Sequence, residues 1–291
     1  MNEEGTTPQA AFLDTKEYRR FAEFCEACRT SRYIGLCYGP PGVGKSFSAW
    51  HYAQWNLIEA YFPGRFYDTP RLPYIEGTIV STVVAHASRI SPELRNCRSI
   101  LYTPSVTNTP KRVGQEVQAL RLALSYLVDA TRPKPKHEPV RSHPVVDPTE
   151  LLLVDETDRL KTASLEQIRD LYDRQPMGVV LIGMPGLEKR LSRYAQLYSR
   201  VGFVHEFRSL SSEEARTVLQ QQWAQWSLTL HSESAAEMEA VAAILRITSG
   251  NFRLLHRLLA QIERIVHINA LRMITKEVVE IARQQLVIGS N

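Results

Sequence analysis

One glycine-rich stretch constrains the fold more than any other part of the sequence. Residues 39–46 read GPPGVGKS and match G-x-x-x-x-G-K-[S/T] at every fixed position. In such a loop the backbone N–H groups point inward and cradle phosphate oxygens, so Gly42 and Gly44 must adopt conformations that a side chain would block. Lys45 would reach the β- and γ-phosphates, and Ser46 would offer its hydroxyl to Mg²⁺. The stretch therefore predicts a site for a nucleoside triphosphate with magnesium.

The segments on either side of this loop have the order that a phosphate-binding loop requires. Residues 33–38 (YIGLCY) are a short apolar run typical of a strand, and residues 46–58 (SFSAWHYAQWNLI) read as a helix. The N-terminal end of that helix would add a partial positive charge beside the phosphates. The expected nucleotide contacts in this region are Gly39, Pro40, Pro41, Gly42, Val43, Gly44, Lys45, Ser46 and Phe47.

A second stretch supplies acidic groups at the position where they are needed. Residues 151–154 (LLLV) predict a buried parallel strand, and Asp155 and Glu156 follow it directly. Ligands bind at the carboxyl ends of the strands in open α/β sheets. We expect Asp155, with Ser46, to hold the magnesium ion and its water shell, and Glu156 to polarise the attacking water.

Strand and helix patterns alternate through the first two thirds of the chain, and this predicts a parallel sheet with helices on both faces. Further strands are expected at residues 99–103, 179–184 and 201–207, and further helices at residues 15–29, 109–129, 165–173 and 187–198. From Leu210 onward the pattern is entirely helical. Helices are expected there at about residues 211–226, 234–247, 252–268 and 275–286.

These patterns divide the chain into three parts. Residues 1–14 are expected to be a flexible tail, residues 15–209 an α/β nucleotide-binding domain, and residues 210–291 a small all-helical lid domain. Within the α/β domain, residues 61–98 read as an irregular insertion, in which residues 78–87 fit a strand or a short helix. Residues 131–148 form a proline-rich basic loop, which is either a solvated surface loop or a phosphate-contacting one.

Composition narrows the choice of partners without fixing it. A net charge of +4 permits an acidic partner such as nucleic acid but does not demand one. No signal pattern and no apolar run of about 18 residues is present, so we expect a cytoplasmic protein without a membrane partner. Cys25 and Cys28 could begin a zinc site, but they lie in a predicted helix and no second ligand pair follows. Buried free thiols are the favoured interpretation.

A nucleotide-binding α/β domain followed by a helical lid resembles the P-loop AAA+ ATPases. More specifically, residues 152–160 (LLVDETDRL), 179–187 (VVLIGMPGL) and 249–253 (SGNFR) resemble the AAA+ regulators of DNA transposition, the TniB, TnsC and MuB type. Members of that family bind ATP at subunit junctions, assemble as rings or filaments on DNA, and recruit or stimulate a transposase. The resemblance implies ATP and Mg²⁺ as cofactors, and duplex DNA, further copies of the chain, a transposase and an adaptor as partners. The short N-terminus favours the TniB/TnsC-like arrangement, because the MuB type carries an additional DNA-binding domain there.

The resemblance also assigns roles to single residues. It implies that Lys45 and Glu156 act in ATP hydrolysis and that Arg253 contacts the γ-phosphate from the lid. It further implies that Arg200 reaches the ATP of a neighbouring subunit, with Arg193 as the competitor. Each arginine could instead form an ordinary surface ion pair. Many AAA+ proteins carry a polar residue where this chain has Met184, so we expect slow hydrolysis that DNA or a partner stimulates, or a substitute for the missing group.

In AAA+ proteins that remodel DNA, the loops after the second strand and before the acidic strand face the DNA channel. In this sequence those loops hold Lys111, Arg112, Lys134, Lys136 and Arg141. Their contacts with phosphates would be independent of base sequence and sensitive to salt. Two alternatives use the same nucleotide site. One is an AAA+ nucleotide switch in secretion or signalling that never binds DNA, and the other is a loader or initiator ATPase of the replication type.

Overall fold

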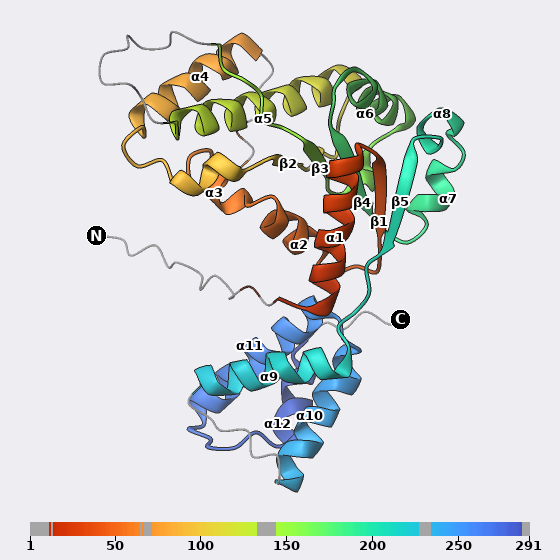
Figure 1. The fold of residues 1–291 in the computed structure, drawn as a ribbon. Coiled ribbons are helices and arrows are strands. Elements are labelled where there is room, and N and C mark those ends of the chain that lie inside the picture. The colour runs from red at the N-terminus through yellow and green to blue at the C-terminus, as the bar shows by residue number, and fades with distance from the viewer. Residues whose placement is uncertain are drawn as a thin grey trace. The chain divides into compact units, whose positions relative to one another are not determined.

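Figure 1 shows the computed structural model, which describes residues 12, 14–64, 66, 72–132, 144–226 and 234–286. The chain divides into two compact units. The nucleotide unit is Phe21–Phe207, and the helical unit combines Met1–Arg20 with Arg208–Asn291. Each unit has its own hydrophobic core and is described by itself.

The nucleotide unit is built on a five-stranded parallel sheet in the order β2-β3-β4-β1-β5. Its strands are β1 (Ile34–Tyr38), β2 (Ser99–Tyr102), β3 (Leu151–Val154), β4 (Gly178–Gly183) and β5 (Val201–Glu206). Every residue of β2, β3 and β4 is buried, whereas burial alternates between intermediate and exposed along β5, which forms one edge of the sheet. The predicted strands and the parallel α/β fold are confirmed.

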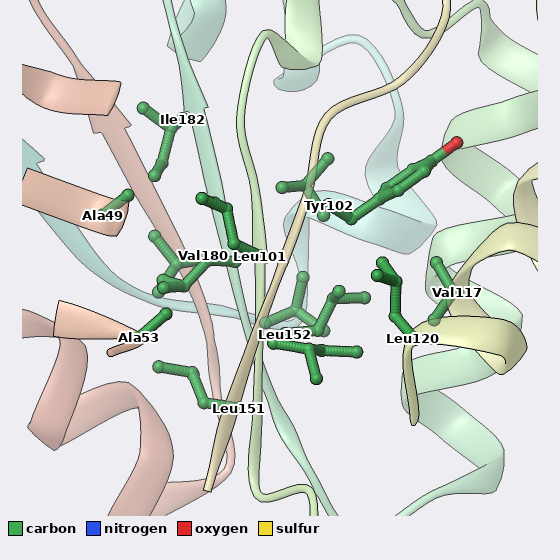
Figure 2. Packing of buried hydrophobic residues seen from close by; sticks show 14 of the residues in the cluster. Ala49, Ala53, Leu101, Tyr102, Val117, Leu120, Leu151, Leu152, Val180 and Ile182 are labelled. Atoms are coloured by element: carbon green, nitrogen blue, oxygen red, sulfur yellow. The ribbon is translucent and has the colours of Figure 1, made fainter. Parts of the chain in front are cut away.

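Helices pack against both faces of this sheet (Figure 1). The helices up to β5 are α1 (Lys16–Ser31), α2 (Lys45–Tyr52), α3 (Trp55–Glu59), α4 (Leu72–Ala85), α5 (Pro110–Ala130), α6 (Thr162–Arg174), α7 (Leu187–Leu191) and α8 (Ala195–Tyr198), with 3₁₀ helices η1 (Pro92–Asn96) and η2 (Thr157–Arg159). Of these, α4 packs on α5. Figure 2 shows Ala49 of α2 on one side of the strands and Val117 of α5 on the other. Successive strand residues alternate between these faces, so Leu151 points toward α2 and Leu152 toward α5.

Three sequence predictions about helices are wrong in detail. The helix expected at residues 46–58 is two helices, because Gln54 adopts a left-handed conformation with φ 50° between α2 and α3. The helix expected at residues 187–198 is likewise divided into α7 and α8, with Tyr194 outside helical geometry. Residues 61–98 are not irregular throughout, since they contain α4 and η1.

The segment that fitted either a strand or a helix lies mostly in α4. Ile79 and Val83 are buried, while Val84 is exposed. Buried positions four residues apart form one face of a helix, and this spacing outweighs the strand preference of the β-branched residues nearby. Helix α5 begins as expected, because the Thr109 hydroxyl accepts a hydrogen bond from the backbone N–H of Arg112.

The helical unit contains α9 (Ser212–Gln225), α10 (Ala235–Thr248), α11 (Phe252–Ile268) and α12 (Lys276–Gln284). Their apolar faces enclose one core with the buried indole of Trp223. The predicted capping box at the start of α9 is present, with Ser211 and Glu214 bonding each other's backbone N–H groups. None of the described helices is long and apolar enough to cross a membrane. All four cysteines are buried and free, as predicted, and burial raises the pKa of Cys28 to about 12.

Gly250 ends α10 and cannot be replaced by a residue with a side chain without a clash. Its φ is +72°, and a Cβ at this position would lie 2.1 Å from the carbonyl oxygen of Leu210. We expect Gly250→Ala to lower the free energy of unfolding of the helical unit by at least about 1 kcal/mol. Gly77→Ala is the control, because Gly77 lies in α4 with open space around its Cα. This change should raise the free energy of unfolding by up to about 1 kcal/mol. Chemical denaturation followed by circular dichroism measures both. A stable Gly250→Ala protein would contradict the clash.

Candidate nucleotide-binding site

The phosphate-binding loop joins β1 to α2 and has the backbone geometry that its sequence requires. Gly42 and Gly44 have φ values of 79° and 113°, which residues with side chains rarely adopt. Gly39 lies against the chain that leaves β5, so a Cβ there would come within 2.2 Å of the Phe207 carbonyl oxygen. Val43 is buried in the core and can offer a ligand only its backbone. The loop is therefore anchored at Gly39 and Val43, and Gly42 and Gly44 have the conformations that let backbone N–H groups face phosphates.

Two prolines and one aromatic residue complete the predicted loop contacts. Pro40 and Pro41 are exposed on the outside of the loop. Phe47 lies in the first turn of α2, where its ring stacks on the indole of Trp50 at 5.9 Å between centroids. The Phe47 side chain therefore packs along the surface of α2. Any contact of these three side chains with a nucleotide stays a prediction.

The side chain of Lys45 folds back into the loop. It is only 9% exposed, and its Nζ donates hydrogen bonds to the carbonyl oxygens of Gly39 (2.6 Å) and Pro40 (2.7 Å). Burial lowers the pKa of Lys45, while the nearby carboxylates of Asp155 and Glu156 act in the opposite direction. A cation held by neutral carbonyl oxygens can exchange them for phosphate oxygens, which carry charge and form stronger hydrogen bonds.

Asp155 lies at the end of β3, on the same edge of the sheet as the loop. Its backbone N–H donates to the carbonyl oxygen of Tyr102 at the end of β2, at 2.9 Å, which continues the strand pairing. The residue is 8% exposed, and burial raises the pKa of its carboxyl, although a hydrogen bond with Ser46 opposes this shift. The structure therefore brings Ser46 and Asp155 together. A hydroxyl and a carboxylate are the hard oxygen ligands that Mg²⁺ prefers, so the residues present fit the ion.

Glu156 stands next to this pair in an unusual backbone conformation. Its φ and ψ are 51° and 42°, in the left-handed region, and a non-glycine residue there costs about 1–3 kcal/mol. Hydrogen bonds on both sides hold it. Its own N–H donates to Asp155 Oδ1 at 2.9 Å, and the hydroxyl of the next residue, Thr157, donates to the Val154 carbonyl oxygen at 2.9 Å. Strain that neighbouring contacts maintain is typical of a residue with a functional role.

Met184 follows β4 at the position where a polar side chain was expected, and 38% of it is exposed. Its backbone N–H donates to Oδ2 of Asp158 at 2.7 Å. Asp158 is thus a site residue that the sequence interpretation missed. The available signal was the third acidic residue of the DETD sequence, which no motif assigned to the nucleotide.

The three arginines discussed above occupy different surroundings. Arg200 forms a two-pronged ion pair with Asp173 of α6, with N···O distances of 2.6 and 2.9 Å. Arg193 is exposed and has no ion pair among the described residues. Arg253 is exposed in the first turn of α11, in the helical unit, so its contact with the γ-phosphate stays a prediction.

The residues predicted to contact DNA differ in exposure and in the ion pairs that they form. Lys111 and Arg112 lie in the first turn of α5, which follows β2. Lys111 is exposed, but Arg112 donates at 2.8 Å to Glu116, which is 1% exposed and also accepts a 2.6 Å hydrogen bond from Tyr102. Arg112 therefore neutralises a buried carboxylate. Lys134, Lys136 and Arg141 lie outside the described residues.

Comparison with known proteins places this site in a family. The AAA domain family matches residues 28–191, more than half of the chain. A potential ATP-binding protein of Staphylococcus aureus is 40% identical over 97% of this chain and 99% of its own length. The Mu-like prophage FluMu DNA transposition protein B of Haemophilus influenzae is 24% identical over 84% of this chain and 70% of its own length.

Solved structures agree with this fold. The RuvB Holliday junction branch migration motor of Thermotoga maritima has a TM-score of 0.54 at 15% identity, over 94% of this chain and 70% of RuvB. The ORC2 protein of Aeropyrum pernix also has a TM-score of 0.54, at 14% identity, over 98% of this chain and 70% of ORC2. At these identities the likeness concerns the fold alone. The family match, the fold and the joined phosphate loop and acidic pair lead to one conclusion: the chain belongs to the AAA domain family of P-loop ATPases, which use ATP with Mg²⁺.

Proposed function

We propose that this chain is an ATP-dependent DNA-binding ATPase that oligomerises on duplex DNA, selects target sites, and recruits or activates a transposase. The observation that carries the proposal is the similarity to a DNA transposition protein over 84% of this chain, together with the nucleotide site that the chain forms. The proposal implies further copies of the chain, a transposase and an adaptor as partners, and a cytoplasmic location where the DNA is accessible.

In the proposed reaction the chain's own residues bind and orient the nucleotide. Lys45 would leave the Gly39 and Pro40 carbonyl oxygens and bind phosphate oxygens, while Ser46 and Asp155 would hold Mg²⁺. The magnesium ion, when bound, neutralises charge that develops on the phosphates. Glu156, fixed beside Asp155, accepts a hydrogen bond from the attacking water and orients it.

The ion pair between Arg200 and Asp173 bears on the proposed role of Arg200 at a neighbouring ATP. For that role the guanidinium must leave Asp173 when a second copy arrives. The phosphates of that neighbour carry more negative charge than one carboxylate, so the exchange is electrostatically favourable. Release of this ion pair would make hydrolysis depend on assembly, in line with the expectation of slow ATP turnover by single copies.

The proposed function is tested with the purified full chain and random-sequence duplex DNA. We expect a non-hydrolysable ATP analogue to produce rings or filaments on the DNA, visible by electron microscopy, and DNA to stimulate ATP hydrolysis. ATP hydrolysis without any response to DNA would instead support a nucleotide switch in secretion or signalling. Stimulation by DNA without ATP-dependent assemblies would favour a loader or initiator of the replication type.

Lys111 is the described residue that best tests DNA contact. We expect Lys111→Glu to weaken binding to duplex DNA several-fold and to reduce the slope of log affinity against log salt by about 1 per subunit. Fluorescence anisotropy with labelled duplex at several salt concentrations measures both quantities. Lys276→Glu is the control, because Lys276 is exposed on α12 in the helical unit and its reversal changes the net charge equally. Equal DNA affinity for Lys111→Glu and the unchanged protein would contradict the predicted contact.

Arg112 is unsuitable for the same test. Changing it to Glu would place a second carboxylate beside the buried Glu116, which Arg112 neutralises at 2.8 Å. An unpaired buried charge destabilises a protein strongly, so a loss of DNA binding in that variant would not distinguish contact from unfolding. The single change at Lys111 avoids this problem because its side chain is exposed.

A further inference from the structure

The nucleotide site contains a third carboxylate to which no role has been given. Asp158 lies in η2, two residues after Glu156, and its side chain is exposed at the carboxyl edge of the sheet. One oxygen, Oδ2, accepts the backbone N–H of Met184, the first residue after β4, at 2.7 Å. The other oxygen has no hydrogen bond within the described part of the chain. The carboxylate thus joins the turn after β3 to the end of the neighbouring strand.

Gly183 makes this contact possible. A Cβ at Gly183 would lie 2.6 Å from Asp158 Oδ2 and 3.0 Å from Leu187 Cδ2. A carboxylate oxygen cannot stay 2.6 Å from a methyl carbon, so any larger residue would force Asp158 away from the Met184 N–H. The glycine at the end of β4 and the aspartate after β3 are therefore complementary in shape.

Further contacts fix the same turn. The guanidinium of Arg190 in α7 donates to the carbonyl oxygen of Asp158, at 3.2 Å, and to that of Leu160. Together with the Met184 contact, these bonds attach the turn after Glu156 to β4 and α7. The turn before Glu156 is attached to β2 through Asp155 and Tyr102. Glu156, in its strained left-handed conformation, lies between the two attachments.

We propose that Asp158 is a positioning residue for ATP hydrolysis, which holds Glu156 in place by bonding the end of β4 where Met184 supplies no polar side chain. The inference rests on the proposed hydrolysis at this site. The effect of Asp158 is transmitted through the backbone of residues 156–158, since the bonded oxygen belongs to Asp158 and the reacting side chain to Glu156.

The first test compares Asp158→Ala with Asp158→Asn. We expect Asp158→Ala to lower kcat for ATP about tenfold or more, with the KM for ATP unchanged within about twofold, because small displacements of a catalytic group are costly. Asp158→Asn should keep most of the activity, since its amide oxygen can accept the same N–H of Met184. Asp170→Asn, at a half-buried residue of α6 paired with Arg174, is the control for loss of a carboxylate elsewhere in the chain. Equal loss in Asp158→Ala and Asp158→Asn, or no loss in Asp158→Ala, would overturn the inference.

A second test uses the glycine and does not depend on removing the acid. Gly183→Ala should lower kcat to a similar extent, because its methyl group displaces Asp158 Oδ2. In the Asp158→Ala background the same change should have little further effect, since no carboxylate is left to displace. Losses that multiply in the double variant would overturn the inference. Binding of a non-hydrolysable ATP analogue, expected to be nearly unchanged, excludes general disruption of the site, and thermal unfolding measures how far the contact of the added methyl group with Leu187 lowers stability.

Failure of the inference about Asp158 can be distinguished from failure of the proposed function. If the unchanged protein hydrolyses no ATP with or without DNA, the proposed function fails before any Asp158 variant is compared. If the unchanged protein is active and Glu156→Gln is inactive while Asp158→Ala is fully active, only the role of Asp158 is overturned.

Discussion

The Lys45→Ala variant should bind ATP a hundredfold or more weakly than the unchanged protein and should show no hydrolysis. The ammonium group of Lys45 is buried at the centre of the loop and makes two hydrogen bonds to neutral carbonyl oxygens, which phosphate oxygens would replace. Each charge-assisted hydrogen bond contributes about 1.5–3 kcal/mol, so losing two amounts to about 3 kcal/mol or more. That energy corresponds to at least a hundredfold in affinity. Isothermal titration calorimetry with a non-hydrolysable analogue and Mg²⁺ measures the change.

A matched control separates the loss of a phosphate contact from the loss of any lysine. Lys161 precedes α6 and is exposed, so Lys161→Ala should bind the nucleotide normally. The fold should survive in both variants, because the loop is anchored by Gly39 against Phe207 and by the buried Val43, independently of Lys45. Nucleotide affinity of Lys45→Ala within a fewfold of the unchanged protein would show that the loop does not bind the triphosphate as its sequence implies.

The positions of the strands along the chain and the nucleotide loop could be predicted from the sequence because both depend on local patterns. Runs of four to six apolar residues identify buried strands, and the phosphate loop has fixed glycines whose positive φ values the structure contains at Gly42 and Gly44. The closeness of Ser46 and Asp155 follows from the same information. Both residues come directly after parallel strands or the loop that follows one, and such ends meet at one edge of a sheet.

Features that depend on a distant partner could not be predicted in this way. The break at Gln54 divides a helical pattern that contains neither glycine nor proline. The ion pair of Arg200 with Asp173 joins residues 27 positions apart in sequence. The contact of Asp158 with Met184 depends on β3 and β4 being neighbours and on a glycine in β4, and no local pattern reports either condition.

The Glu156→Gln variant should bind ATP as tightly as the unchanged protein but lose about 10²- to 10⁴-fold in the rate of hydrolysis. Glutamine has nearly the same shape as glutamate but cannot accept a proton from the attacking water. The backbone around position 156 should not move, because neighbouring groups hold it through the Asp155 and Thr157 hydrogen bonds. Release of labelled phosphate in a single turnover measures the chemical step directly. Glu166→Gln, at a half-buried residue of α6 paired with Arg169, is the control.

Under the proposed function, the same variant should prolong the ATP-bound assemblies on DNA. If hydrolysis ends the contact with DNA, a protein that binds but does not cleave ATP should remain on duplex DNA much longer after dilution into competitor DNA, as fluorescence anisotropy can follow. Asp155→Asn should behave differently. It removes the negative charge of a carboxylate that would bind Mg²⁺, so it should weaken nucleotide binding itself. If Glu156→Gln dissociates from DNA rapidly in the presence of ATP, release from DNA does not depend on ATP hydrolysis.

Combining changes at two acidic residues tests the chemical assignment most strictly. If Glu156 orients the attacking water and Asp158 only positions Glu156, adding Asp158→Ala to Glu156→Gln should slow hydrolysis no further, because the group being positioned is already inactive. If instead Asp158 contacts the water itself, each change should remove its own contribution and the double variant should be much slower than Glu156→Gln. If the residual activity of Glu156→Gln disappears on adding Asp158→Ala, the contact with the attacking water belongs to Asp158, which follows β3, and not to Glu156.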